Sequence, residues 1–318
     1  MIAGKRVLIT GGAGFIGSEL ASRLVEQNDV IAYDHLSRNS LGNKTLLSHS
    51  RFELVKGDVL DREALVRAMD GVDTVVHCAA VAGIDTVVRS PVATMKVNML
   101  GTLNVLELAS QVGVPGRVVC FSTSEIFGQL AYHSAETDPA VVGNVGEARW
   151  TYAVGKLAAE HMAIAFHREH NLPTVVLRPF NVYGPGQVGE GALRTFIQRA
   201  IKDEPIEVHG DGTQIRAWCY LEDMVDAALL AITNENAVGE SFNIGNPRVV
   251  TTIYDLARTV IRVLDSRSEI VFSPRSLADV ELRVPSVRKA EEVLGFKAKV
   301  DLEEGITRTG AYYARHSS

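Results

Sequence analysis

Apolar and polar positions follow a repeating pattern through the first half of the chain. Short runs of consecutive apolar, β-branched residues predict strands near 5–10, 29–34, 52–57, 73–78, 117–122 and 173–178. The amphipathic stretches between them predict helices near 15–27, 61–70, 92–112 and 151–170. Because the predicted strands are apolar on successive residues, helices should cover both faces of their sheet. The pattern therefore predicts an α/β fold with a Rossmann-type, doubly wound parallel sheet.

The pattern of the sequence changes after Arg178. From there on, loops rich in glycine and proline, such as 183–187, separate shorter predicted elements. These elements predict a smaller C-terminal lobe. A helix near 222–234 and a strand at 241–244 should return to the large sheet. We therefore expect one domain over 1–178 together with 222–246, and a second lobe made of 179–221 and 247–318.

Composition narrows the classes of partner and compartment. The net charge is -6 and the basic residues are scattered, so we expect neither a nucleic acid nor an anionic membrane as partner. Three cysteines, an odd number in apolar surroundings, indicate reduced thiols and no disulfide. Neither a secretory signal after Met1 nor a run of 18 apolar residues is present, which makes the cytoplasm the expected location.

A glycine-rich turn at 10–17 lies between the first predicted strand and the first predicted helix. In that context Gly11 suits a tight turn, Gly14 a close approach of the backbone to a pyrophosphate, and Gly17 close packing of helix on strand. The N-terminus of the helix offers N–H groups and a positive dipole end to the phosphates. The segment therefore predicts a dinucleotide site.

An acid at the end of the second predicted strand supports the same site. Asp34 follows Gly17 by 17 residues, where a carboxylate accepts hydrogen bonds from both ribose hydroxyls and repels a 2'-phosphate. This favours NAD over NADP, although the nearby Arg38 leaves NADP open. The other residues expected at the dinucleotide site are Phe15, Ile16, Ser37, Asp58, Val59, Ala79, Ala80, Asn98, Ser122 and Pro179.

Two polar clusters supply candidate catalytic groups. Tyr152 and Lys156 are four residues apart in a predicted helix and so share a face, which suits a phenol acting as base with an ammonium group beside it. We expect this ammonium, together with an oxidised nicotinamide, to lower the pKa of the phenol. Hydroxyl and carboxyl groups follow the strand near 117–122, where they can orient a substrate hydroxyl and relay its proton: Thr123, Ser124 and Glu125.

A metal site is not predicted. His161, His167 and His170 share one predicted helix, but offsets of six and nine residues place them on different faces.

The motifs together resemble the extended short-chain dehydrogenases/reductases that modify nucleotide sugars. The resemblance covers nearly the whole chain and rests on 10–17, Asp34, Asp58, 77–80, Asn98, 122–128, 152–156 and 178–185 in order. It implies a domain that holds NAD permanently, a C-terminal lobe that binds a sugar nucleotide, most simply a UDP-sugar, and a homodimer built through the helices near 92–112 and 151–170. It also implies substrate contacts from Val81, Asn181, Arg194, His209, Arg216 and Arg283.

Within this resemblance the reaction stays open among three branches. The Thr123-Ser124-Glu125 triplet is similar to that of UDP-glucuronate decarboxylases and of GDP-mannose dehydratases, whereas simple 4-epimerases usually have no acid at position 125. The stretches 142–152 and 279–288 resemble the bacterial decarboxylase of lipid A aminoarabinose synthesis. We therefore favour decarboxylation of UDP-glucuronate, with 4-epimerisation and 4,6-dehydration as alternatives. A non-catalytic NAD sensor would have lost the Tyr, Lys and Thr set, which is intact.

Overall fold

The computed structural model describes residues 2–42, 45–274 and 280–316. Its centre is a seven-stranded parallel sheet, which confirms the predicted fold class. The strands lie in the spatial order β12 (Ser241–Ile244), β7 (Thr174–Pro179), β5 (Arg117–Phe121), β4 (Thr74–His77), β1 (Arg6–Thr10), β2 (Asp29–Asp34) and β3 (Phe52–Lys56). The strand predicted at 241–244 thus returns to the sheet beside β7.

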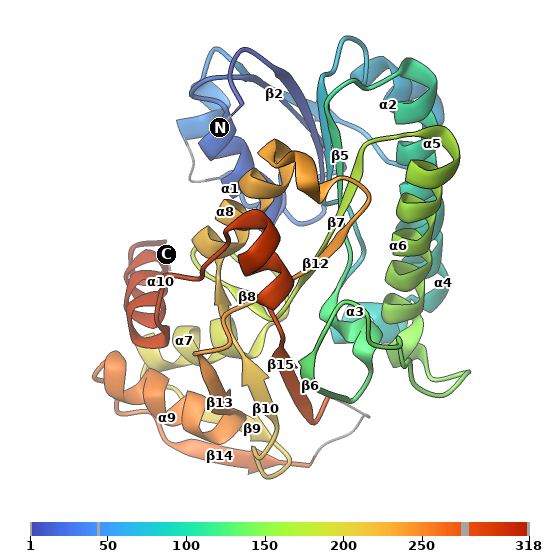
Figure 1. Cartoon of the computed structure of the whole chain (residues 1–318). Coiled ribbons are helices and arrows are strands. Elements are labelled where there is room, and N and C mark those ends of the chain that lie inside the picture. The colour runs from blue at the N-terminus through green and yellow to red at the C-terminus, as the bar shows by residue number, and fades with distance from the viewer. Residues whose placement is uncertain (1, 43–44, 275–279, 317–318) are drawn as a thin grey trace.

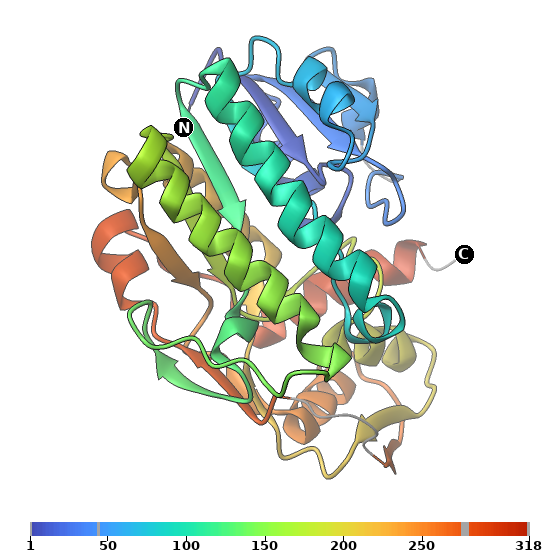
Figure 2. The same ribbon diagram turned by 90° about the vertical axis from the view of Figure 1, so that its right-hand side faces the viewer.

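Helices cover both faces of this sheet (Figure 1). Helices α1 (Phe15–Leu24) and α8 (Leu221–Thr233) bury their apolar faces in one core, and α2 (Arg62–Ala68), α5 (Thr102–Val112) and α6 (Thr151–His170) bury theirs in another. Figure 2 shows α5 and α6 side by side along one outer face. Strand order reverses between β1 and β4, and ligands of open α/β sheets bind beyond the carboxyl ends of strands at such a point.

The helix expected near 92–112 is interrupted. It consists of α4 (Pro91–Met95), a π-helical segment over Lys96–Gly101 and then α5, and α3 (Ile84–Arg89) precedes it. The π-helical segment packs on α6, where a Cβ at Gly155 would lie 3.3 Å from the Cβ of Asn98. The break therefore accompanies a close approach of two helices.

The smaller lobe contains a four-stranded sheet in the order β13 (Val250–Thr252), β10 (Ile215–Ala217), β15 (Leu282–Pro285) and β6 (Leu130–Ser134). Two strand pairs accompany it, β14 (Ile270–Ser273) with β9 (Ile206–His209) and β11 (Cys219–Tyr220) with β8 (Val182–Tyr183). Its helices are α7 (Ala192–Ile201), α9 (Ile253–Val263) and α10 (Leu302–His316). Short helical turns elsewhere span Thr45–Ser48, Ser124–Phe127, Ala148–Trp150, Glu235–Ala237 and Ala290–Leu294.

The expected domain boundary at residue 178 does not hold for β6. This strand comes from the N-terminal half of the chain but pairs with β15 in the smaller sheet. Ala131 of β6 packs in a small apolar cluster with Ile126, Phe127 and Phe180.

The general expectations from composition can also be compared with the structure. All three cysteines are free thiols. Across the described ranges, helices that combine the length and apolar character needed to cross a bilayer are absent. The same residues hold no cluster of His, Cys, Asp and Glu side chains suited to a metal ion.

Candidate active site

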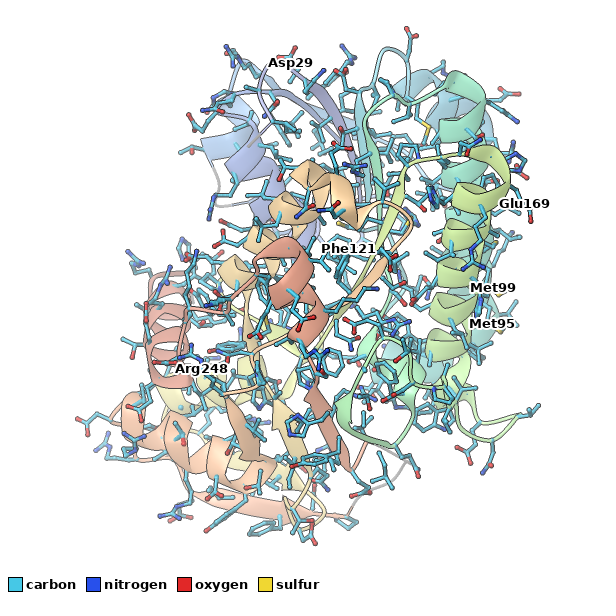
Figure 3. The ribbon with its side chains drawn as sticks, in the orientation of Figure 1. Asp29, Met95, Met99, Phe121, Glu169 and Arg248 are labelled. Atoms are coloured by element: carbon cyan, nitrogen blue, oxygen red, sulfur yellow. The ribbon has the colours of Figure 1, made fainter. Side chains whose placement is uncertain are left out.

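A cavity of about 400 Å³ opens beyond the carboxyl ends of the central strands, a size typical of ligand sites. Phe121, at the end of β5, lies near the middle of the molecule beside it (Figure 3). With the exception of Asn98, every residue expected to bind a dinucleotide lines this cavity: Gly11, Gly14, Phe15, Ile16, Gly17, Asp34, Ser37, Asp58, Val59, Ala79, Ala80, Ser122, Tyr152, Lys156 and Pro179.

The glycines of the first turn are required by close backbone contacts. Gly11 has a φ of +70°, and a Cβ there would lie 2.6 Å from the backbone nitrogen of Ala79 on the neighbouring segment. A Cβ on Gly17 would lie 2.3 Å from the carbonyl oxygen of Gly11. A Cβ on Gly14 would lie 3.1 Å from the same carbonyl oxygen, a looser contact than at the other two glycines, and all three line the cavity. The contacts at Gly11 and Gly17 fit the tight turn and the close packing that their spacing predicts, and the approach of Gly14 to a pyrophosphate stays a prediction.

The start of α1 is suited to phosphate. Its N-cap, Gly14, has no side chain to cap the helix, and the first turn holds no acidic residue. Phe15, Ile16 and Gly17 line the cavity at this positive end of the helix dipole. An anion bound here would receive the N–H groups that open the helix.

Asp34 is fixed at the end of β2. One carboxylate oxygen accepts a hydrogen bond from the backbone N–H of Leu36 at 2.7 Å, and the other accepts one from Ala13 at 3.1 Å. These bonds attach the glycine turn to the second strand. The carboxylate remains at the wall of the cavity beside Ser37, where it can meet a ribose.

Three segments that are distant in sequence close one side of the cavity. The guanidinium of Arg38 donates to the hydroxyl of Thr86 at 3.0 Å and lies 3.9 Å from the carboxylate of Glu190. That carboxylate also accepts from the Thr86 hydroxyl and from the backbone N–H groups of Asp85 and Thr86, at 2.9 to 3.2 Å. We call these three side chains, Arg38, Thr86 and Glu190, the clasp. Because the clasp competes for Arg38, it disfavours a 2'-phosphate contact and supports NAD.

Asn98 does not line the cavity, contrary to the expectation that it touches the cofactor. Its buried side chain accepts a hydrogen bond from the backbone N–H of Val81 at 2.8 Å and donates one to the Val81 carbonyl at 3.0 Å. It therefore supports the cavity wall from behind. Val81, expected at the substrate site, lines the same cavity.

Tyr152 and Lys156 both face the cavity from α6, as their spacing predicts. The Lys156 ammonium is buried and donates a hydrogen bond to the Phe121 carbonyl at 2.7 Å. Burial lowers the pKa of Lys156 to about 8. The lysine is thus attached to the end of β5, one helical turn from the phenol.

The groups that control the pKa of Tyr152 differ from those expected. Burial raises this pKa well above its ordinary value, and the negative charge of Glu125 raises it further. A hydrogen bond with Thr123 and the positive charges of Arg149 and Arg283 oppose these effects. The main lowering contributions therefore come from these three side chains and not, as expected, from Lys156.

Glu125 lies in the short helical turn after β5, between two arginines. Its carboxylate pairs with Arg149 at 2.5 Å and lies 3.9 Å from Arg283. Thr123 caps this turn by accepting a hydrogen bond from the Glu125 backbone N–H at 3.1 Å, and Ser124 is buried beside it. The turn thus places the Thr123 hydroxyl in hydrogen-bonding contact with the Tyr152 phenol, and the Glu125 carboxylate near enough for its charge to raise the pKa of that phenol.

The expected substrate residues divide into two groups. Arg216 and Arg283 are buried and directly opposite each other on β10 and β15, so their guanidinium groups suit a diphosphate. Asn181, at a φ of +40°, links the lobes by donating to the Ala217 carbonyl at 2.7 Å.

The other two residues point elsewhere. Arg194 donates to the Gly189 carbonyl, packs over the Tyr313 ring and lines a separate cavity between α7 and α10. The His209 side chain is 68% exposed at the end of β9, where it lies 3.9 Å from Glu207. Of the six expected substrate residues, Val81 alone lines the cavity that holds Tyr152. Arg194 and His209 contact other parts of the smaller lobe. Of the stretch 279–288, position 279 lies outside the described residues.

Two residues at the site were not expected. Arg149 precedes Tyr152 by three residues, so its spacing in the sequence was an available signal. Glu190 lies in a loop and meets Thr86 across 104 positions of sequence, and no local pattern indicates such a contact.

Comparisons with known proteins agree with this description of the site. A model of the NAD dependent epimerase/dehydratase family matches residues 7–245. UDP-glucuronic acid decarboxylase 3 of Arabidopsis thaliana is 38% identical over 307 residues, which cover 95% of this chain and 86% of that protein.

Solved structures match along nearly the whole chain. The UDP-glucose 4-epimerase of Thermotoga maritima with UDP-glucose has a TM-score of 0.90 and 32% identity, covering 98% of this chain and 100% of that one. The UDP-glucuronic acid 4-epimerase of Bacillus cereus, in complex with UDP-glucuronic acid and NAD, has a TM-score of 0.90 and 26% identity, covering 98% and 99%.

The residues of the cavity fit NAD. The crowded glycine turn, the uncapped start of α1 and the acid at the end of β2 correspond to diphosphate and ribose sites. Tyr152 and Lys156 line the same cavity. The chain belongs to the NAD dependent epimerase/dehydratase family, as an enzyme that uses NAD to modify a nucleotide sugar.

Proposed function

We propose that the enzyme removes carbon dioxide from UDP-glucuronate by way of a ketone at C4 of the sugar. The observation that carries this proposal is the position of Glu125 beside the Tyr152 phenol, between Arg149 and Arg283. An acid at this place can handle a proton at C5, next to the carbon that Tyr152 serves. The decarboxylase of Arabidopsis thaliana, similar along 95% of this chain, supports the same branch.

The first step requires a base at the C4 hydroxyl. NAD supplies a hydride acceptor when bound, and Asp34, the glycine turn and Lys156 are the residues that would hold it. Tyr152 as phenolate removes the hydroxyl proton, and the Thr123 hydroxyl orients the sugar oxygen. The resulting ketone lies β to the C6 carboxylate.

In the second step the bond between C5 and C6 breaks and its electron pair moves to the ketone, which forms an enolate and releases carbon dioxide. Glu125 directs the proton that C5 then takes up, either as donor or through a water. Tyr152 returns its proton to the C4 oxygen when the ketone is reduced. Arg216 and Arg283 hold the diphosphate and so keep C4 in place.

Epimerisation at C4 is the second candidate. Its support is the UDP-glucuronic acid 4-epimerase of Bacillus cereus, which has the same fold with a TM-score of 0.90. In that reaction the ketone turns over in the site before it is reduced, and the C6 carboxylate is retained. Dehydration is the third candidate, in which a C5 proton and the C6 hydroxyl leave.

Mass spectrometry of the products separates the three reactions. We expect purified protein incubated with UDP-glucuronate to release carbon dioxide and give a UDP-pentose. An isomer of unchanged mass would select the epimerase instead, and loss of water in a parallel incubation with UDP-glucose would select the dehydratase. The Glu125→Gln variant should lose decarboxylation while still oxidising C4, whereas Tyr152→Phe should lose both.

We further infer that two copies pair through α5 and α6, as the family resemblance implies. These helices lie side by side on one outer face (Figure 2). Each carries an exposed apolar side chain, Val112 on α5 and Val154 on α6. A dimer by light scattering, converted to a monomer by Val154→Glu, is the expected result; a monomeric parent protein contradicts it.

A further inference from the structure

The ion pair between Arg149 and Glu125 is the shortest charged contact next to the proposed base. Its nitrogen and oxygen are 2.5 Å apart, and the two side chains are only 5% and 19% exposed. A buried, charge-assisted hydrogen bond of this kind fixes both partners in orientation. Both charges of this ion pair act on the pKa of the Tyr152 phenol.

Arg149 is itself held rigidly. It lies in the helical turn Ala148–Trp150, which leads directly into α6, so the same turn positions Arg149 and Tyr152. Its guanidinium packs over the Trp150 ring at 5.1 Å. The Trp150 indole donates to the Glu147 carboxylate at 2.9 Å and fills the space beside Gly143, where a Cβ would lie 1.9 Å from the indole nitrogen.

Several elements present charged or polar groups to the Tyr152 phenol. The turn after β5 contributes Thr123 and Glu125, the turn before α6 contributes Arg149, and β15 contributes Arg283. Lys156 follows one turn later on α6 itself. Glu125 is the acid among them, and its negative charge opposes a phenolate nearby.

The Tyr152 phenolate and the Glu125 carboxylate are both negative, and two negative groups in one buried site need a fixed positive charge between them. Arg283 is one source, 3.9 Å from Glu125, but it stands opposite Arg216 where a diphosphate is expected, and a bound diphosphate would offset its charge. Arg149 is directed at Glu125 itself. The compensation that persists with a nucleotide sugar bound is therefore that of Arg149.

We propose that Arg149 is a positioning residue that holds Glu125 in place and offsets its charge, so that a Tyr152 phenolate can form beside the Glu125 carboxyl group. This role rests on the proposed function of Tyr152 as the base. It applies to oxidation at C4, and so to either a uronate or a neutral UDP-hexose.

The test is the pH profile of C4 oxidation in a single turnover of the NAD-loaded enzyme, followed by nicotinamide absorbance. In Arg149→Met the acidic limb of the rate profile should move up by roughly one pH unit, since one unit charge next to the phenol is lost. At a pH below that limb, oxidation should be about tenfold slower than in the parent. Arg149→Lys should keep the limb near that of the parent. Adding Glu125→Gln to Arg149→Met should move the limb back down, which a merely structural role of Arg149 would not produce.

An unmoved limb in folded Arg149→Met, or a limb that stays shifted in the double variant, overturns the proposal. If Arg149→Met does not fold, as judged by its circular dichroism, the pH profile of the single variant Glu125→Gln tests the proposal. Its limb should move down, because Arg149 then favours phenolate unopposed, and an unchanged limb is the contrary result.

The choice of substrate separates this proposal from the proposed function. Oxidation of UDP-glucose without turnover of UDP-glucuronate would contradict the proposed substrate, while the limb shifts measured with UDP-glucose still test Arg149. If the parent protein oxidises neither sugar, the assignment of Tyr152 as the base is contradicted, and with it the role of Arg149.

Discussion

Replacing Glu190 by glutamine should weaken the hold of the enzyme on NAD. The Glu190 carboxylate joins the loop before α7 to the start of α3, and Arg38 adds a third segment. Glutamine keeps the length of the side chain but loses its charge and one acceptor oxygen, and its amide group would face the N–H groups of Asp85 and Thr86. The clasp should then open more often.

The size of the effect follows from the contacts. The carboxylate accepts three hydrogen bonds between 2.9 and 3.2 Å, and its side chain is 29% exposed. Bonds to charged groups contribute about 1.5–3 kcal/mol each when buried, and allowing for solvent we expect a total loss of about 2 kcal/mol. If NAD binding requires the closed clasp, that loss corresponds to roughly thirtyfold weaker binding.

Isothermal titration calorimetry of the protein stripped of cofactor measures this change, and the NAD content of the protein as purified checks it. Glu169→Gln is the matched control, because Glu169 is exposed at the outer end of α6 (Figure 3). Wild-type affinity for NAD in Glu190→Gln would refute the reasoning about the clasp. Equal weakening in Glu169→Gln would do so as well.

Gly17→Ala should lose NAD and about 1–3 kcal/mol of stability, because its Cβ would lie 2.3 Å from the Gly11 carbonyl; calorimetry and urea unfolding measure both, and unchanged values contradict the tight turn. Burial lowers the pKa of His77 from 6.5 to about 3, so the unfolded chain binds a proton that the folded chain excludes. Stability should fall as pH drops from 6.5 toward 3, by up to about 1.4 kcal/mol per pH unit from this group. His77→Asn should show a shallower slope in urea unfolding, and an equal slope is the contrary result. Glu160→Gln should cost about 3 kcal/mol in the same assay, since it leaves buried Arg178 without the carboxylate it binds at 2.7 to 3.1 Å; a cost near zero is the contrary result.

The sheet could be predicted from sequence because its strands are apolar on successive residues, a strong local signal. The π-helical segment over 96–101 could not be predicted, since it accompanies a tertiary contact, the packing of Asn98 against Gly155 of α6. The pairing of β6 was also missed. That strand is short, its buried positions do not alternate, and its partner β15 lies about 150 positions further along the chain.

At the site, too, local patterns could be predicted from sequence and long-range contacts could not. The glycine turn and the spacing of Tyr152 and Lys156 are local patterns, and the structure places both at one cavity. The partners of Glu125 and Glu190 lie 24 and 104 positions away, so only the folded chain brings them together. Arg194 was expected at the substrate from resemblance, but the packing of α7 directs its side chain toward Tyr313 of α10.

The most direct test of the account follows the hydrogen on C4. UDP-glucuronate carrying deuterium at C4 should show a primary isotope effect on C4 oxidation in a single turnover, and the pentose product should keep the deuterium at C4. Carbon dioxide release at the same rate with either isotope, together with C4 oxidation by Tyr152→Phe at the parent rate, would contradict a ketone formed by that base.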